Sequence, residues 1–595
     1  SSSLTFTLPG ADGSNGQVLT TNGSGTLSWT TASGGSSDLN ALSDVRFGGT
    51  NFTSSLLIGH QTTGTLDNAS YNIGVGVGTL QSITTGDNNV ALGYQSLYSN
   101  TTASNSVALG YQSLYSNTTG TWNLAIGHRA LYSNVDNYYN LAIGENALEN
   151  NVANFNIAVG YQAMRSNTSG SYNAAFGYEA LSSNTTGGRN SAFGLNAMAK
   201  NTVGQWNSAF GKAALVENIS GESNTAIGEI AMLSNTSGSF NTAVGRRAML
   251  SNTTADNNVA IGFDTLYYNT TGANHTAVGT QALYNNTTGS SNSALGYNSL
   301  FSNTIGLDNV GFGAEALYSN TSGNYNSASG TSSLYSNTTG SNNSGYGYRA
   351  LFSNTTGAQN TSIGGYSLYT NTTGNNNAGM GFKALYYNTT GVENMGVGTY
   401  ALFSNTTGSY NMGVGTYALI NNTTANNNSG IGYSALYNTT TGSQNTAIGG
   451  NSLKTNTTGA FNTAIGYEAG FSSQTGSGNL FLGSRAGYSE TGSNKLYIAN
   501  SDTQNLIVGD FSTGWMTFGR AGLSTGGIGI YGDLGARFYD DDGSNFIALV
   551  APQAVTSNLT FTLPNSSGTS GQVLATNGSG TLSWAEPVAL TYSTE

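Results

Sequence analysis

The chain has 595 residues, of which only 7% are charged, while Gly fills 84 positions and Cys none. The absence of Cys excludes disulfides, thiolate metal sites and cysteine nucleophiles. The net charge of −12 disfavours nucleic acid as a partner, because phosphate binding requires clustered Lys and Arg. No apolar stretch approaches the ~20 residues that span a bilayer, so we expect no membrane insertion. Because disordered chains usually combine low hydrophobicity with high charge, this composition favours a repetitive β structure with a thin core.

Residues 1–50 are predicted to form a small N-terminal β shaft module. The segment contains short extended runs, such as LTFTLP at residues 4–9, separated by Gly-containing turns. The same motifs return near the C-terminus at an offset of 555 residues. The C-terminal copy is preceded by two further motifs that the N-terminal copy lacks. We therefore expect the module to be truncated and the chain to be a piece of a longer fibre.

Residues 51–500 repeat every seventeen residues. The Gly that ends motifs such as NLAIG (residues 123–127) recurs from Gly59 to Gly483. The span from Gly76 to Gly483 is 483 − 76 = 407 residues, one less than 24 × 17, because one residue is missing between Gly144 and Gly160. A deletion tolerated at that point predicts a turn on the surface.

Each repeat has the same order of residue types around its Gly. An Asn stands four residues before the Gly, with Ser106 and His275 as exceptions, while an apolar residue usually stands directly before the Gly and Leu or Met four residues after it. This short extended run predicts a strand, and a second Asn opens a turn with the sequence NTTG. The five residues between, such as 94–98, fit either a second strand or one helical turn. Stacked coils would place equivalent residues above one another and form amide ladders. The predicted ladder includes Asn123, Gly127, Asn173, Gly177, Asn241 and Gly245.

Seventeen residues suit one coil of an elongated β-solenoid, so the predicted fold class is all-β. All four Pro residues lie outside the array, where a missing N–H breaks no ladder. Each coil offers only two or three large apolar side chains, which predicts a poorly filled core for a lone chain. We therefore expect several chains to share the core, most simply as a homotrimer.

Residues 501–550 are predicted to form a shaft connector, and residues 551–595 a C-terminal β module that repeats residues 1–30. The connector contains an acidic run, Asp540, Asp541 and Asp542, directly before Gly543. Clustered carboxylates suit Ca²⁺, which makes this run a weak candidate metal site. A solvated turn is the favoured interpretation of the same charges.

The array resembles the head repeats of trimeric autotransporter adhesins, to which residues 105–110 (NSVALG) and 462–469 (NTAIGYEA) are similar. The seventeen-residue period departs from those heads, whose repeats are usually shorter. Residues 494–502 and 509–514, together with the flanking modules, resemble tail-fibre proteins of tailed phages. These resemblances imply a homotrimeric, left-handed parallel β-roll that displays binding surfaces far from its anchor. Such fibres often carry a C-terminal chaperone that cleaves itself off, and nothing in this chain resembles it.

The function that these resemblances imply is a structural virion fibre, from a phage tail or head, at the virion surface. It would act as a rigid spacer and as an adhesin for a host-surface glycan or protein receptor, joined to other tail or capsid proteins. The alternative is a trimeric adhesin on a bacterial cell surface.

No enzymatic activity and no cofactor are predicted. The three histidines, His60, His128 and His275, have no plausible Ser and Asp partners, and two of them occupy repeat positions. A glycan depolymerase would need a carboxylate pair in a groove, and the array offers no consistent pair. The repeated NTT and NTS triplets are formal glycosylation sequons, but turn chemistry explains them better.

Exposed aromatic residues directly before the strand Asn are the candidate receptor-binding side chains. They vary from coil to coil, and aromatic faces beside polar groups suit carbohydrate recognition. The favoured alternative is that they pack on a neighbouring coil or subunit. These residues are Trp122, Phe155, Tyr172, Trp206, Phe240, Tyr325, Tyr410 and Phe461.

Overall fold

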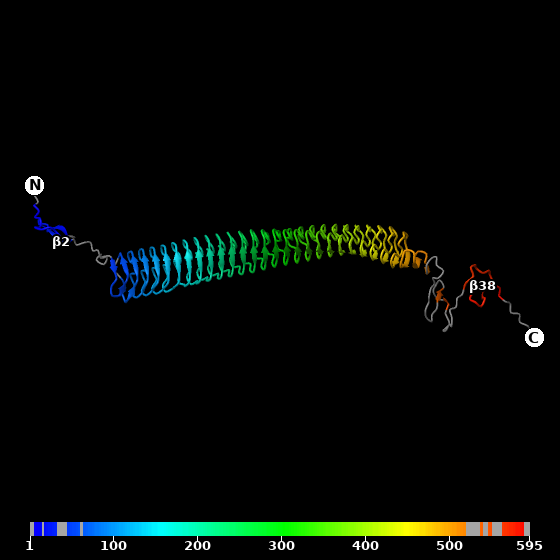
Figure 1. The fold of residues 1–595 in the computed structure, drawn as a ribbon, viewed down its shortest axis with the longest axis horizontal. Helices are drawn as coiled ribbons and strands as arrows, with labels where there is room; N and C mark the ends of the chain where they lie inside the picture. The colour runs from blue at the N-terminus through cyan, green and yellow to red at the C-terminus, as the bar shows by residue number, and fades with distance from the viewer. Residues whose placement is uncertain are drawn as a thin grey trace, which may run out of the picture.

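The computed structural model describes residues 5–14, 17–31, 45–59, 63–518, 536–539, 546–549 and 562–587. These residues form strands and turns and contain no helix. The array is a long β-solenoid, drawn as a row of stacked coils in Figure 1. The prediction of an all-β solenoid with seventeen-residue coils is therefore confirmed. The trimer and the left-handed sense stay predictions.

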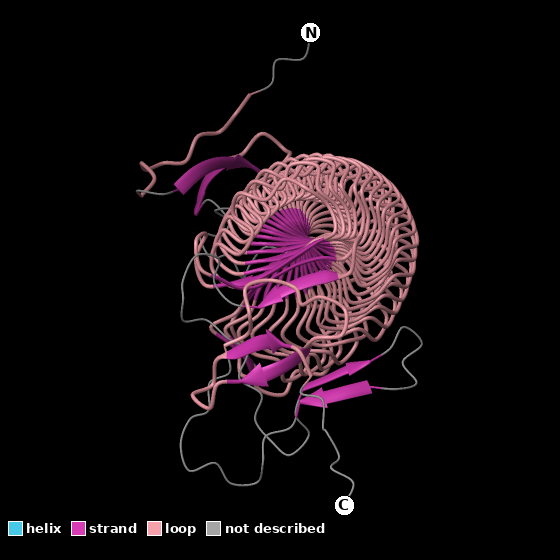
Figure 2. Ribbon diagram, turned by 90° about the vertical axis from the view of Figure 1, so that its right-hand side faces the viewer, coloured by secondary structure: helices cyan, strands magenta, loops and turns pink. Residues whose placement is uncertain are grey.

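One parallel ladder of mostly three-residue strands runs along the solenoid, from β5 (Leu56–Ile58) through β7 (Ile73–Val75) to β32 (Lys495–Ala499). Equivalent residues pair across successive coils, as Ala125 does with Ala142. The missing residue leaves this register intact, since Ala142 pairs with Ala158. The ladder has 27 strands, β5 and β7 to β32, and its 26 intervals of ~4.8 Å give a rod of about 125 Å. Viewed along the rod, the strands fan around the axis (Figure 2).

The strands between β7 and β32 have the following bounds: β8 (Val90–Leu92), β9 (Val107–Leu109), β10 (Leu124–Ile126), β11 (Leu141–Ile143), β12 (Ile157–Val159), β13 (Ala174–Phe176), β14 (Ser191–Phe193), β15 (Ser208–Phe210), β16 (Thr225–Ile227), β17 (Thr242–Val244), β18 (Val259–Ile261), β19 (Thr276–Val278), β20 (Ser293–Leu295), β21 (Val310–Phe312), β22 (Ser327–Ser329), β23 (Ser344–Tyr346), β24 (Thr361–Ile363), β25 (Ala378–Met380), β26 (Met395–Val397), β27 (Met412–Val414), β28 (Ser429–Ile431), β29 (Thr446–Ile448), β30 (Thr463–Ile465) and β31 (Leu480–Leu482).

The interior of each coil is filled by one large apolar side chain, small residues and amides. In the coil of Gly127, Ala125, Ala130, Leu131 and Asn134 are completely buried. The apolar residue directly before the Gly points outward instead, because side chains alternate across a strand. The expectation that a lone chain would leave its core poorly filled is wrong, since Ala and Asn occupy the space that a count of large hydrophobic residues overlooks.

The segment after each Gly is neither a second strand nor a helical turn. Its second and fourth residues have positive φ, as at Gln112 (53°) and Leu114 (50°). Gln112 N–H donates to Tyr94 O of the preceding coil, and Leu114 N–H donates to Ala130 O of the following coil. A left-handed residue other than Gly costs about 1–2 kcal/mol, which hydrogen bonds to both neighbouring coils offset.

The two terminal modules contain the same hairpin. In the first, β1 (Gln17–Thr21) pairs antiparallel with β2 (Leu27–Thr31), and in the second β37 (Val573–Thr576) pairs with β38 (Leu582–Ala585). Trp29 Nε1 donates to Ala11 O (3.0 Å), and Trp584 Nε1 donates to Ser566 O (2.7 Å). The 555-residue sequence repeat is therefore a repeat of structure.

The remaining strands flank the array. The short strands β3 (Val45–Phe47), β4 (Phe52–Thr53) and β6 (Ala69–Ser70) lie at its start, where β3 pairs antiparallel with β5. At its end, β33 (Asn505–Asp510) and β34 (Trp515–Phe518) continue the sheet in antiparallel order. A separate pair, β35 (Ala536–Tyr539) and β36 (Phe546–Leu549), is also antiparallel.

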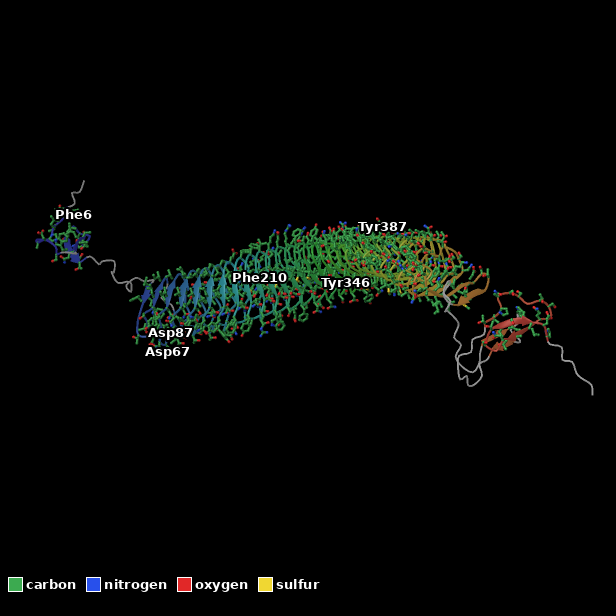
Figure 3. All side chains as sticks on the ribbon, turned by 45° about the vertical axis from the view of Figure 1, so that its right-hand side comes forward. Phe6, Asp67, Asp87, Phe210, Tyr346 and Tyr387 are labelled. Carbon is green, nitrogen blue, oxygen red and sulfur yellow. The ribbon has the colours of Figure 1, made fainter. Side chains whose placement is uncertain are left out.

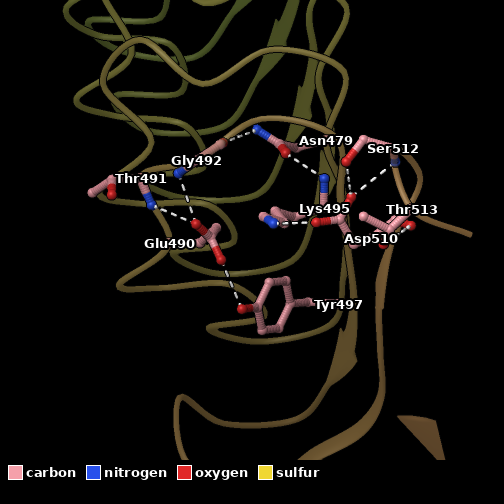
Figure 4. Close-up of polar contacts among 9 residues, drawn as sticks. All are labelled: Asn479, Glu490, Thr491, Gly492, Lys495, Tyr497, Asp510, Ser512 and Thr513. Carbon is pink, nitrogen blue, oxygen red and sulfur yellow. Dashed lines mark hydrogen bonds and ion pairs between the residues drawn. The ribbon is translucent and has the colours of Figure 1, made fainter. Parts of the chain in front are cut away.

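Polar contacts close the array where the sheet turns antiparallel (Figure 4). The last strand Asn, Asn479, donates to Gly492 O (2.9 Å) and accepts from Lys495 N–H (2.7 Å). The Lys495 ammonium pairs with Asp510, and this contact and Ser512 hold the pKa of the Asp510 carboxyl well below its usual range. Through these bonds, the polar groups at the end of the ladder find hydrogen-bond partners within the same chain.

Candidate functional site

The strand Asn residues form a buried ladder along the array, in which Ser106 and His275 replace the amide in two coils. Asn241 Nδ2 donates to Asn224 Oδ1 (3.1 Å) and Ala255 O (2.8 Å), and its Oδ1 accepts from Asn258 N–H (3.0 Å). Asn123 and Asn173 occupy the same ladder and donate in the same way to the turn of the following coil. The ladder ties the strand of each coil to the turns and strands beside it.

The repeating glycines lie where no other residue fits. Gly127, Gly177 and Gly245 have φ of 137°, 145° and 137°. A Cβ on Gly245 would lie 2.3 Å from the carbonyl oxygen of Gly262 in the next coil. Backbone packing between coils therefore requires Gly, and these predicted positions are structural.

The Asn of the sequons forms a second buried ladder. Asn184 Nδ2 donates to Asn167 Oδ1 (2.8 Å) and to Gly187 O (2.9 Å). The following Thr185 hydroxyl donates to Thr202 O of the next coil. The Asn184 side chain, which would carry the glycan, is completely buried. These triplets therefore act as turn and ladder residues in the folded coil.

The predicted aromatic residues all lie on the surface, at the position directly before the strand Asn, which we call the pre-strand position. Their exposed fraction ranges from 36% at Phe155 to 66% at Phe461. Each has positive φ, as in every coil from Asn88 to Phe461. The left-handed backbone places a bulky side chain there at a cost that Asn, Asp or Gly would largely avoid.

In the N-terminal part of the array the pre-strand rings stack on one another. Successive ring centroids lie 6.2 Å apart for Trp122 and Tyr139, 5.5 Å for Tyr139 and Phe155, and 4.9 Å for Phe155 and Tyr172. The Arg189 guanidinium lies between the rings of Tyr172 (5.8 Å) and Trp206 (5.6 Å). These contacts are the packing on a neighbouring coil that the alternative interpretation expects, and Trp122 (54%) and Tyr172 (56%) stay more than half exposed.

Sequence reasoning missed Tyr139 and Arg189 in this stack. Tyr139 stands seventeen residues after Trp122, and Arg189 stands seventeen residues after Tyr172. The register alone could therefore have placed both in the row.

The other four predicted rings stand alone. Phe240, Tyr325, Tyr410 and Phe461 contact no ring and no cation among the described residues. Polar residues or Gly occupy the pre-strand position on either side of each, such as Asp308 and Asn342 beside Tyr325. No other ring and no cation of the described residues therefore covers a face of these four rings.

A further aromatic ladder is formed by the residue directly after the buried Leu of successive coils. Nine half-buried rings from Tyr267 to Phe403 stack at centroid distances of 5.0–5.3 Å. Their mutual contact covers the ring faces and adds side-chain packing between coils.

No group of three or more His, Cys, Asp or Glu side chains in the described part of the chain could hold a metal ion. The candidate metal residues Asp540, Asp541 and Asp542 lie outside the described residues, as does His60. His128 stacks on Tyr111, with centroids 5.2 Å apart. Within the described ranges, no helix is long and apolar enough to cross a membrane.

His275 replaces Asn in the buried strand ladder. Its Nδ1 accepts from Asn292 N–H (3.2 Å), and its Nε2 lies 3.1 Å from Asn286 Nδ2. Burial lowers the pKa of His275 from 6.5 to about 4, against backbone hydrogen bonds that raise it. The ladder therefore requires the neutral ring.

Acidification should loosen the array at His275. A depressed folded-state pKa means that the unfolded chain binds the proton more tightly, so stability is complete above pH 6.5 and falls toward pH 4. The loss amounts to about 3 kcal/mol, locally in the coils around His275. Hydrogen exchange of residues 258–292 at pH 4 and pH 7 measures it. In a His275→Asn variant this pH dependence should disappear, and a dependence that persists there contradicts the assignment.

No protein-family model matches the chain, and neither a curated protein nor a solved structure matches it. The fold itself defines the class, a β-solenoid repeat protein with a hydrogen-bonded amide interior and a variable row of surface rings.

Proposed function

We propose that this protein is a structural virion fibre, of a phage tail or head, that acts as a rigid spacer and host-surface adhesin. The observation that carries the proposal is the contrast between an interior that is nearly the same in every coil and a variable pre-strand row. Amide and backbone ladders link every coil to its neighbours over about 125 Å, which suits a stiff spacer. The exposed rings differ from coil to coil and need no role in that ladder.

The proposal includes a homotrimer. The apolar residue directly before the Gly forms an outward row along the sheet, and Phe210 and Tyr346 mark it in Figure 3. Other exposed members are Leu92, Ile227, Ile261, Leu295, Phe312, Ile363, Met380, Ile448 and Ile465. The row is apolar or aromatic except at Ser329, and an exposed row of this length is typical of an interface for which copies of the same chain offer a matching row. A trimeric mass in light scattering supports this assembly, and a monomeric mass contradicts it.

A binding role rather than catalysis fits the surface chemistry. Acidic side chains change position from coil to coil. Among the described residues, no three His, Cys, Asp or Glu side chains form a group that could hold a metal ion. We therefore propose that the variable rings contact a receptor.

The purified chain should bind host cells and reduce attachment of the particles that carry it. Equal attachment at saturating protein contradicts the adhesin role. Binding between cells of the producing culture, with no effect on particle attachment, would instead favour the bacterial surface adhesin.

A further inference from the structure

Three of the isolated rings recur at one interval. Phe240, Tyr325 and Tyr410 are separated by 325 − 240 = 85 and 410 − 325 = 85 residues, which is five coils of seventeen. Each ring is more than half exposed. At ~4.8 Å per coil, successive rings stand roughly 24 Å apart along the rod.

Tyr325 and Tyr410 also share their neighbours. The pre-strand position of the preceding coil holds Asp308 or Glu393, and that of the following coil holds Asn342 or Asn427. These four side chains are exposed and form no hydrogen bond or ion pair with another described residue. Each ring thus lies between a free carboxylate and a free amide, one coil away on either side.

Phe240 differs in the groups that matter for hydrogen bonding. It has no hydroxyl, and Ser223 stands at the position of the carboxylate, with Asn257 on the other side. It therefore repeats the ring without the acidic neighbour, and we restrict the site to the two Tyr positions.

The fold does not require Tyr at either position. The backbone is left-handed at Tyr325 (φ 58°) and at Tyr410 (φ 61°), and other coils place Asn274 or Gly478 there with the same sign of φ. Asn, Asp or Gly, which suit this conformation better, occupy the position in many coils without a ring, and Gln359 and Gln444 occupy it in others. Two bulky, more than half exposed side chains held in a disfavoured conformation, with no ring or cation against them, indicate contact with something outside the coil.

The charges around the two sites limit the classes of ligand that can bind there. No Lys or Arg occurs between residues 248 and 348 or between 384 and 453, so neither site has a basic residue in the coil of its ring or in the preceding coil. Arg349, in the coil that follows Tyr325, packs on the rings of Tyr348 and Phe352. The carboxylates of Asp308 and Glu393 would repel an anionic ligand. A neutral ligand with hydroxyl groups fits these sites.

We propose that Asp308, Tyr325 and Asn342, and equally Glu393, Tyr410 and Asn427, form two equivalent sites for neutral hexopyranose units of a surface polysaccharide. The ring face packs on the C–H face of the sugar. The carboxylate accepts from sugar hydroxyls, and the amide both donates and accepts. Two sites on one rod allow a long polymer to bind at both, which raises avidity. This assignment rests on the adhesin role proposed above and specifies its ligand class.

Binding of the purified full chain to neutral mannan, galactan and glucan tests the sites, with anionic polygalacturonate as the charge control. At least one neutral polymer should bind, and polygalacturonate should not. The double variant Tyr325→Asn/Tyr410→Asn should weaken binding at least tenfold, while each single variant loses less. Asn is the residue that other coils use at this position, so the fold is preserved. Tyr139→Asn, within the stacked group, is the matched control and should bind as the unmodified chain does.

Absence of binding to all three neutral polymers overturns the proposal. So does preferential binding of polygalacturonate, or an equal loss from Tyr139→Asn and from the double variant. Particle attachment that the purified chain still blocks, without any polysaccharide binding, would refute the sugar sites and leave the adhesin role standing. Sugar binding by a chain that never affects attachment would do the reverse.

Discussion

Replacing Asn241 by Asp should destabilise its coils by about 4 kcal/mol at neutral pH, because the change is nearly isosteric but buries an unpaired charge. The new carboxylate oxygen would replace the amide nitrogen that now lies 2.8 Å from Ala255 O and 3.1 Å from Asn224 Oδ1. Burial raises the pKa of such a carboxyl, so lowering the pH protonates it and restores part of the loss. Hydrogen exchange of residues 224–258 resolves the effect locally, since long repeat arrays do not unfold as one unit.

The matched control for that substitution is Asn257→Asp. Asn257 lies at the exposed pre-strand position, where both Asn and Asp occur in other coils. A new charge there stays in water and should change stability by less than about 0.5 kcal/mol. Equal protection in both variants would mean that the amide ladder does not hold the coils together.

The second large effect is expected at the repeating glycine. Gly245→Ala should destabilise the adjacent coils by about 4 kcal/mol, because both the backbone conformation and the available space exclude a Cβ. Gly245 has φ of 137°, and the added atom would lie 2.3 Å from the backbone oxygen of Gly262. Chemical denaturation followed by hydrogen exchange of residues 228–262 measures the loss.

Gly365→Ala is the control for the glycine variant. A Cβ at Gly365 would meet only the Phe382 ring, at 3.7 Å, an ordinary van der Waals contact. Its φ is not positive, so Ala there should be neutral or slightly stabilising, as it restricts the unfolded chain. A Gly245 variant as stable as this control would contradict the close backbone packing between coils.

The solenoid could be predicted from sequence because its signals repeat. The seventeen-residue period, the strand ending at Gly127 and the stacking of Asn241 on Asn224 all follow from register alone. One copy of the motif would not have been enough to predict a strand and a turn, whereas many copies in register predict the same strand and turn in each coil.

The filling of the interior could not be predicted in the same way. The residue before the Gly, such as Ile261, is of a type usually found in the core of a sheet, yet it points outward. The small Ala260 beside it points inward. The width of the coil decides this choice, and the width depends on the turn after the Gly. That turn uses positive φ at ordinary residues such as Leu114, for which no local sequence signal exists.

The sequence predicted only part of the candidate site. The exposed aromatic position was identified, but the separation of the stacked rings from the isolated ones was not. That separation depends on the residue one coil away, as Trp122 beside Tyr139 differs from Tyr325 beside Asp308. Reading each ring together with its neighbours at this spacing makes the distinction available without a structure.

The central claim is that this rod projects from a virion as a host-binding fibre. Electron microscopy of intact particles labelled with a gold-conjugated antibody against residues 63–499 tests it most directly. The account predicts label along thin fibres attached to the tail or head of the particle. Label confined to bacterial cell envelopes, with none on intact particles, would contradict it.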